Sequence, residues 1–254
     1  MHTQGPVTTL TLSRPEVRNA LGPEMIMELT HLFHALSLDE SRVIVVTGEG
    51  DAFCAGADLE WMKASRTLSD DRNVADAATA RTMWETIDSC PKPVIARVNG
   101  PALGGGSGLV ACADVAIAVD SAILGFTEVR VGLIPATISP YVLRKIGPGH
   151  TRALFVSGRR FSAEEAARIG LVHRVVAAAD LDAAVTETAD ELLACSPVAI
   201  AESKRLVRDA TAQLALPDLP VRRAAVRAAP EAQEGLAAFL EKKRPGWVVR
   251  STES

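Results

Sequence analysis

The sequence has few aromatic residues and no excess of positive charge. Aromatic side chains make up 4% of its 254 residues, and the net charge is −4 at neutral pH. Binding of nucleic acid depends on basic surfaces and often on base stacking by aromatic rings. The composition therefore predicts no nucleic-acid partner.

Cysteine is also scarce, and its spacing excludes two classes of protein. The four cysteines, at positions 54, 90, 112 and 195, form no CxxC pair. We expect reduced, buried thiols in a cytoplasmic protein and not a disulfide framework or a zinc site. The histidines form no HExxH motif, and His31 and His34, three residues apart on a predicted helix, have no further ligands in view. No metal is predicted.

Long uninterrupted apolar runs are absent as well. The N-terminal segment has no basic region followed by an apolar one, so no secretory signal is predicted. The most apolar stretch, residues 103–119, is interrupted by Gly105, Gly106, Gly108 and Asp114. It is typical of a buried glycine turn, a helix and a strand, and it does not predict a membrane span.

Short apolar strands alternate with helical patterns along most of the chain. Buried strands are predicted at residues 7–12, 42–47, 93–98 and 114–119, and helices at 23–38 and at 59–90 with a break near 69–73. This alternation indicates an α/β fold with parallel strands. We predict a boundary near residue 195, between a core of residues 1–195 and a helical region of residues 196–254 that packs on the core or on another subunit.

Two glycine-containing turns follow two of the predicted strands. Residues 52–59 come after the strand at 42–47, and residues 99–106 come after the strand at 93–98. Such turns place unpaired backbone N–H groups at the carboxyl end of a parallel sheet, where α/β folds bind ligands. Two N–H groups that converge on one point can form an oxyanion hole, and the second turn would also lie at a helix N-terminus.

The glycines allow other interpretations. A dinucleotide-binding GxGxxG motif fails because Leu109 stands where its third glycine should be, and no GK[ST] phosphate loop is present. A nucleophile elbow, GxSxG, fails at the same leucine. A purely structural glycine turn stays open on the pattern alone.

Five segments, in order, resemble the signatures of the enoyl-CoA hydratase/isomerase (crotonase) family. They are RPEVRNAL at 14–21, FCAGADL at 53–59, NGPALGGG at 99–106, EVRVGLIP at 128–135 and EKKRP at 241–245. The resemblance implies a spiral of ββα units with parallel sheets and a C-terminal helical region. It also implies a homotrimer or dimer of trimers that acts on a CoA thioester. CoA would enter as part of the substrate, and no separate cofactor is implied.

The resemblance implies roles for single residues. The backbone N–H groups of Ala57 and Gly105 would hold the thioester oxygen. Residues implied to contact CoA are Ala55, Ala57, Asp58 and Leu59 along the adenine and pantetheine, and Arg18, Ala20 and Leu21 at the nucleotide end.

Two residues near the C-terminus, Phe239 and Lys242, are implied to reach the CoA of a neighbouring subunit. Each also has a structural interpretation. Phe239 could pack in the core with its apolar neighbours at helical spacing, and Lys242 could complement the helix dipole.

The sequence departs from the family pattern at one catalytic position. Two-carboxylate hydratases of the family carry one Glu three residues after the middle glycine of GGG and another twenty residues later. Here these positions are Gly108 and Glu128. Glu128 is therefore the predicted sole acid/base, the alternative being a surface acid paired with Arg130. We expect Gly108 to border the substrate and to leave room that a substrate carboxylate could use.

One Glu suffices for two reactions. It can add water to an enoyl-CoA or shuttle a proton between carbons in a Δ3–Δ2 enoyl-CoA isomerase. Residues 133–142, with Gly108, resemble bacterial hydratases for 3-methylglutaconyl-CoA and related branched substrates, so hydration is favoured. A non-catalytic acyl-CoA-binding protein is the third possibility.

The acyl-binding residues are less evident from the sequence. The candidates to line an acyl pocket are Trp61, Met62, Met83 and Trp84. The cations that could bind a carboxylated acyl group are Lys63, Arg66, Arg81 and Arg144.

Overall fold

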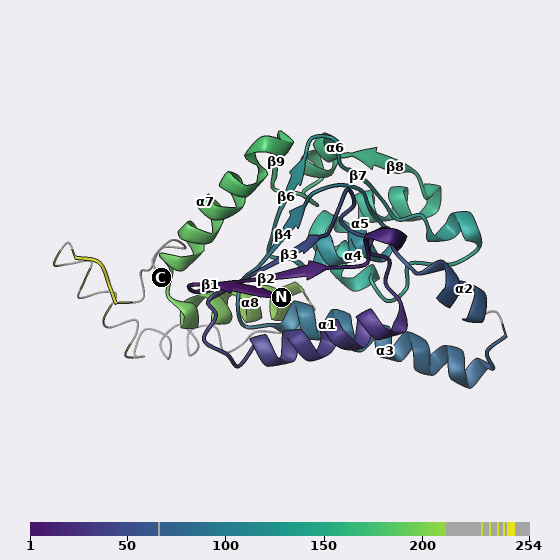
Figure 1. Ribbon diagram of the computed structural model, residues 1–254, viewed down its shortest axis with the longest axis horizontal. Helices are drawn as coiled ribbons and strands as arrows, with labels where there is room; N and C mark the ends of the chain where they lie inside the picture. The colour runs from purple at the N-terminus through teal and green to yellow at the C-terminus, as the bar shows by residue number, and fades with distance from the viewer. Residues whose placement is uncertain are drawn as a thin grey trace.

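The computed structural model describes residues 1–65 and 67–211, together with residues 230, 234, 238, 241 and 243–246 (Figure 1). In these residues the larger sheet has the strand order β1-β2-β3-β4-β6-β9. In that order the strands are His2–Gln4, Val7–Leu12, Val43–Gly48, Val94–Val98, Val115–Val119 and Arg174–Val176. β1 runs antiparallel to β2, and every other pair is parallel. The predicted strands and their parallel pairing are confirmed, whereas the antiparallel edge was not predicted.

A smaller sheet lies beyond the carboxyl ends of the central strands. Its strands are β5 (Ala102–Leu103), β7 (Ile123–Gly125) and β8 (Arg160–Ser162). β5 pairs with β7 in parallel, and β7 pairs with β8 antiparallel. The second glycine turn, which contains β5, is thereby held between the two sheets.

The helices cover the sheets and supply the rest of the core. In chain order they are α1 (Pro23–Leu36), α2 (Leu59–Ser65), α3 (Asp70–Ser89), α4 (Gly105–Cys112), α5 (Ser139–Ser157), α6 (Ala163–Arg168), α7 (Leu181–Leu193) and α8 (Pro197–Thr211). Three short 3-10 helices are η1 (Pro15–Val17), η2 (Glu128–Val131) and η3 (Ala178–Asp180). Every residue of β3 is buried, as expected for a parallel strand with both faces covered.

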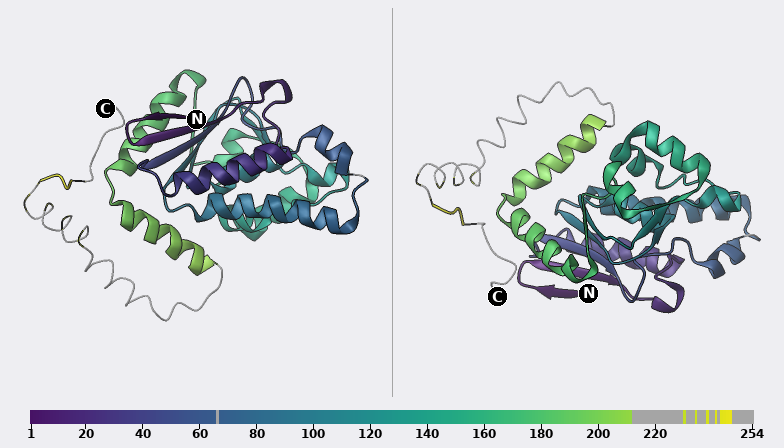
Figure 2. Two further views of the ribbon diagram at one scale, coloured as in Figure 1. Left: turned by 60° about the horizontal axis from the view of Figure 1, so that its bottom comes forward. Right: turned by 90° about the horizontal axis from the view of Figure 1, so that it is seen from above.

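The helix α1 shows how the apolar pattern sets the packing. Pro23 occupies the first turn, where its missing N–H costs no hydrogen bond. The buried residues of α1, Met25, Ile26, Leu29, Phe33 and Leu36, recur at helical spacing. They belong to the hydrophobic core, and α3 runs beside α1 in both Figures 1 and 2. Within the described residues, no helix is both long and apolar enough to cross a membrane.

The predicted break in the helical segment 59–90 lies earlier than expected. α2 ends at Ser65 and α3 begins at Asp70. Ser69 has the extended backbone conformation of an N-cap residue, so the polar residues after it form the first turn of α3. The predicted break is confirmed, but it lies between Ser65 and Asp70 because residues 70–73 form the start of α3.

Three of the four cysteines are buried free thiols, as predicted, but Cys195 is exposed. Cys195 follows α7 in the short connection to α8, and its thiol donates to the carbonyl of Glu191. The prediction of a buried thiol is therefore wrong at this position.

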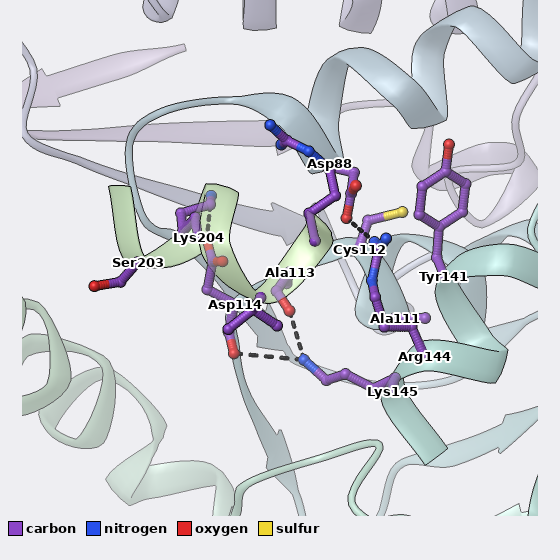
Figure 3. Close-up of a pocket in the computed structure, with 12 residues that line it drawn as sticks. Asp88, Ala111, Cys112, Ala113, Asp114, Tyr141, Arg144, Lys145, Ser203 and Lys204 are labelled. Atoms are coloured by element: carbon purple, nitrogen blue, oxygen red, sulfur yellow. Dashed lines mark hydrogen bonds and ion pairs between the residues drawn. The ribbon is translucent and has the colours of Figure 1, made fainter. Parts of the chain in front are cut away.

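The helix α8 is fastened to the core by an ion pair. Lys204 Nζ lies 2.6 Å from Asp114 Oδ2 and donates a second hydrogen bond of 2.8 Å to the Lys92 carbonyl. The same Asp114 oxygen accepts a hydrogen bond of 2.8 Å from the backbone N–H of Val94, at the start of β4. Asp114 therefore joins α8 to the central sheet (Figure 3).

Further charged residues surround this ion pair. Arg144 pairs with Asp88 at the end of α3 and lies over the Tyr141 ring. Lys145 Nζ donates to the Ala113 carbonyl, just beyond the last residue of α4 (Figure 3). Burial lowers the pKa of Lys145 to about 8. These contacts connect α3, α4 and α5 close to the attachment of α8.

We expect Asp114→Asn to lower the free energy of unfolding by about 1–3 kcal/mol, because a charged acceptor shared by two donors is lost. Urea unfolding measures this change. The control is Glu187→Gln, which breaks the exposed ion pair with Arg174 and should cost less than about 1 kcal/mol. Equal losses in the two variants would contradict the anchoring role of Asp114.

Candidate active site

The two glycine turns follow β3 and β4 and contact each other directly. Cys54 and Ala102 form a parallel bridge between them. The N–H of Leu103 donates to the Cys54 carbonyl at 3.0 Å, and the N–H groups of Phe53 and Cys54 donate to the Pro101 carbonyl at 3.1 Å. The turns are thus joined by hydrogen bonds although they are about fifty residues apart in the sequence.

Glycine is required where the turns approach most closely. A Cβ atom on Gly106 would lie 2.1 Å from the Cys54 carbonyl oxygen. A Cβ atom on Gly56 would lie 2.7 Å from the Leu103 carbonyl oxygen, and Gly56 has a φ of +96°, which side chains rarely allow. The glycines therefore do have a structural role. They also serve the site, because they permit the close contact between the two turns that forms it.

The segment after η1 supports the first turn from its other side. The N–H of Leu21 donates to the Gly56 carbonyl at 2.7 Å, and the N–H of Asp58 donates to the Leu21 carbonyl at 3.0 Å. The N–H of Ala55 donates to the Arg18 carbonyl at 2.9 Å. Residues on both sides of Ala57 are therefore tied down by backbone hydrogen bonds.

The backbone N–H groups of Ala57 and Gly105 have no backbone acceptor within the described residues. Ala57 lies between the two residues that bond to Leu21, so its own N–H points away from that segment. Gly105 is the first residue of α4, where an N–H has no partner inside the helix. Both residues line one cavity, so their N–H groups can serve as an oxyanion hole, assisted by the α4 dipole.

The cavity has a volume of about 350 Å³ and lies between α2, α3 and the segment after η2. Its lining residues are Leu21, Ile26, Ala57, Trp61, Met62, Ser65, Asn73, Asp76, Ala77, Ala80, Trp84, Gly105, Glu128, Leu133, Ile134, Pro135, Thr137 and Ile138.

Glu128 places a carboxylate beside the second glycine turn. Its Oε1 would lie 3.3 Å from a Cβ atom on Gly104, and its Oε2 is buried without a hydrogen-bond partner in the described residues. Burial raises the pKa of this carboxyl above its ordinary value, which makes the carboxylate a better proton acceptor. The alternative of a surface acid paired with Arg130 is wrong, because Arg130 donates to the Gly158 carbonyl.

The Asp58 carboxylate is bound by other groups of the protein. Its Oδ2 lies 2.8 Å from Arg14 Nη2, and its Oδ1 accepts a hydrogen bond of 2.8 Å from the N–H of Glu60 in the first turn of α2. These contacts lower the pKa of Asp58, although burial acts in the opposite direction. The side chain therefore joins the segment of residues 14–21 to the first glycine turn and to α2.

The other residues predicted to contact CoA flank the same turn. Ala20 and Leu21 are buried beneath it, whereas Leu59 is exposed at the start of α2 and Arg18 is exposed with a φ of +52°. Ala55 is half-buried within the turn. Phe239 and Lys242 lie outside the described residues.

The expectation that Gly108 leaves room for the substrate is wrong. A Cβ atom on Gly108 would lie 2.6 Å from Ile138 Cγ2 and 3.3 Å from the Trp84 ring. Ile138 and Trp84 line the cavity, and Gly108 lies behind them. The position of the missing family carboxylate is therefore filled by apolar side chains that come from α3 and from the residue before α5.

Of the four residues predicted to line an acyl pocket, three do so: Trp61, Met62 and Trp84. Met83 is wrong, because it is fully buried in the core. It precedes Trp84 by one residue, which turns its side chain about 100° around α3 and away from the cavity.

The cations predicted to meet a substrate carboxylate are paired elsewhere. Lys63 lies 2.5 Å from Glu60, Arg81 lies 2.7 Å from Glu85, and Arg144 belongs to the charged residues near α8. None of the three lines the cavity. Arg66 lies outside the described residues.

Four polar residues of the lining were missed by the sequence analysis. They are Ser65, Asn73, Asp76 and Thr137. Thr137 accepts a hydrogen bond of 3.3 Å from Trp84 Nε1. Asn73 and Asp76 share one face of α3 with Ala80 and Trp84, and this helical spacing is a signal that could have identified them.

Comparisons with known proteins identify the family of the chain. The family model for enoyl-CoA hydratase/isomerase matches residues 2–250. The enoyl-CoA hydratase AKT6-1 of Alternaria alternata is 35% identical over 207 residues, which cover 81% of this chain and 67% of that protein.

Solved structures show the same fold. An enoyl-CoA hydratase from Shewanella pealeana has a TM-score of 0.92 at 35% identity, covering 97% of this chain and 94% of that one. An enoyl-CoA hydratase/isomerase from Marinobacter aquaeolei has a TM-score of 0.91 at 34% identity, covering 98% of each chain. The chain belongs to the enoyl-CoA hydratase/isomerase family and has the crotonase fold. It is an enzyme of the hydratase/isomerase type that acts on acyl-CoA.

The packing at Gly108 can be tested by a double-mutant cycle. Gly108→Ala should lower the free energy of unfolding by about 1–3 kcal/mol, because the new methyl group meets Ile138. In an Ile138→Ala background the same change should cost at least about 1 kcal/mol less, since alanine is the better helix former and the clash is relieved. Urea unfolding of the four proteins gives these values, and an equal cost in both backgrounds would rule out the proposed contact.

Proposed function

We propose that this protein is an enoyl-CoA hydratase that adds water across the α,β double bond of an enoyl-CoA thioester. The observation that carries the proposal is the placement of the Glu128 carboxylate beside the second glycine turn, in the cavity that Ala57 and Gly105 also line. CoA enters as part of the substrate, and we propose no further cofactor.

In this mechanism the thioester oxygen accepts hydrogen bonds from the N–H groups of Ala57 and Gly105. The α4 N-terminus favours the negative charge that develops on the oxygen, so the β-carbon becomes more electrophilic. Glu128 takes a proton from water while the water oxygen bonds to the β-carbon. The resulting carboxyl group returns a proton to the α-carbon, which completes the 3-hydroxyacyl product and restores the carboxylate.

The cavity supports an uncharged acyl group better than a charged one. Apolar residues such as Ile134 and Ile138 suit a branched chain, so they support the branch of 3-methylglutaconyl-CoA but not its terminal carboxylate. A carboxylated acyl group has less support, because Asp76 lines the cavity and none of the described lining residues is a cation. We therefore propose a branched or straight enoyl group ahead of a carboxylated one.

A second candidate function is a Δ3–Δ2 enoyl-CoA isomerase. Ile138 and Trp84 pack against Gly108, so no second catalytic carboxylate is present at that position. Glu128 is then the one carboxylate assigned to proton transfer, which favours the isomerase. A single carboxylate can move one proton between carbons without a held water. A non-catalytic acyl-CoA-binding protein is less favoured. The buried Glu128 oxygen without a hydrogen-bond partner lowers the stability of the fold, and a role in catalysis explains why such a group is present.

We also propose assembly into a homotrimer or a dimer of trimers. Val198, Leu206 and Val207 of α8 are exposed apolar side chains, with 46%, 40% and 58% of their surface accessible. Burial of such residues against another subunit would remove apolar surface from water, and closed symmetry is the common solution.

Glu128→Gln should lower kcat by about 10²–10⁴-fold on the best substrate, because the amide keeps the shape of the side chain but transfers no proton. The substrates are crotonyl-CoA, 3-methylglutaconyl-CoA and a 3-enoyl-CoA, with product analysis for hydration or double-bond movement. Acyl-CoA affinity should change little, because both backbone donors remain.

The matched control for this experiment is Glu24→Gln, on the exposed first turn of α1, which should keep full activity. Full activity in Glu128→Gln would remove Glu128 from the mechanism. Exclusive conversion of the 3-enoyl-CoA would replace hydration by isomerisation as the function.

A further inference from the structure

The residues that line the cavity change from apolar to polar along α3. Five of its lining residues, Asn73, Asp76, Ala77, Ala80 and Trp84, lie on one face of this helix at spacings of one to four residues. Trp84 marks the reacting end, because a Cβ atom on Gly105 would lie 3.7 Å from its ring. Asp76 precedes Trp84 by eight residues, which corresponds to about 12 Å along the helix axis. The cavity therefore has a reacting end at Trp84 and a far end at Asp76.

Polar side chains gather at the far end. Asp76 and Asn73 come from the first turns of α3, and Ser65 comes from the last turn of α2. α2 and the first turns of α3 lie at the same end of the molecule (Figures 1 and 2). Between the two ends, Ala77 and Ala80 supply small apolar surface. An acyl chain that extends from the thioester along α3 would thus pass alanines and meet a carboxylate.

Asp76 lines the cavity and is partly removed from water. Its side chain is half-buried, and burial raises the pKa of its carboxyl, while the nearby Trp61 side chain acts in the opposite direction. A carboxylate in such surroundings gains from a further hydrogen-bond donor and is repelled by a second carboxylate. None of the described lining residues supplies a positive charge that would reverse this preference.

We propose that Asp76 selects the acyl chain: the far end of the cavity favours a medium-length acyl group with a terminal hydroxyl or other hydrogen-bond donor and disfavours one with a terminal carboxylate. This inference deepens the proposed function and rests on it for the position of the thioester. Asp76 acts on the far end of the acyl group and takes no part in proton transfer at the α- and β-carbons.

The test measures binding of three saturated medium-chain acyl-CoA thioesters that differ only in a terminal methyl, hydroxyl or carboxylate group. Isothermal titration calorimetry compares the native protein, Asp76→Asn and the control Asp71→Asn. Asp71 lies on the same helix, is exposed and does not line the cavity. Both variants remove one negative charge, so a general charge effect would appear in both.

The native protein should bind the hydroxyl-tipped thioester roughly tenfold or more tightly than the carboxylate-tipped one. Asp76→Asn should reduce that ratio by roughly tenfold, and Asp71→Asn should leave it unchanged. A native ratio near one, an unchanged ratio in Asp76→Asn, or an equal change in both variants would overturn the proposal.

The binding experiment tests the selection by Asp76 independently of the proposed reaction. Saturated thioesters can be neither hydrated nor isomerised, so the binding ratios do not depend on which reaction occurs. If the ratios behave as expected but no enoyl-CoA is converted, the proposed function fails while the selection by Asp76 stands. If enoyl-CoA is hydrated but the ratios do not change, only the selection fails.

Discussion

The site depends on the contact between the two glycine turns. The Cys54 carbonyl occupies the space that any side chain at position 106 would need, and the Leu103 carbonyl does the same for position 56. Through this contact the turns that follow β3 and β4 are held together, and residues 18–21 hold the first turn from its other side. The N–H groups of Ala57 and Gly105 then border one cavity without any side chain acting as a donor. A backbone oxyanion hole of this kind is rigid before the substrate arrives, which is the property that makes such donors effective.

Glu128 approaches the second of these turns at Gly104. Gly104 has a φ of +50° and carries no side chain, so the carboxylate can approach the turn. Burial without a partner for one oxygen is unfavourable for folding, and it raises the pKa of the group. A base next to an electrophilic thioester benefits from this raised pKa. The desolvation of Glu128 therefore has two effects: it lowers the stability of the fold, and it makes the carboxylate a stronger base.

The sequence predicted local features well and long-range packing poorly. The strand at residues 7–12 is confirmed residue for residue, and the glycine turns lie where the strands end, because apolar periodicity and glycine spacing are local signals. The contacts of Gly108 were missed, since Ile138 comes thirty residues later and no spacing rule connects them. The different orientations of Met83 and Trp84 depend on which face of α3 meets the core. The roles of Phe239 and Lys242 stay predictions.

The most direct test of the account is a crystal structure of the protein with a bound saturated acyl-CoA. The account predicts that the thioester oxygen lies about 2.7–3.1 Å from the backbone nitrogen atoms of both Ala57 and Gly105. It also predicts the Glu128 carboxylate beside the α- and β-carbons and the acyl chain along α3. A thioester oxygen bound elsewhere, or held by one of the two N–H groups alone, would contradict it.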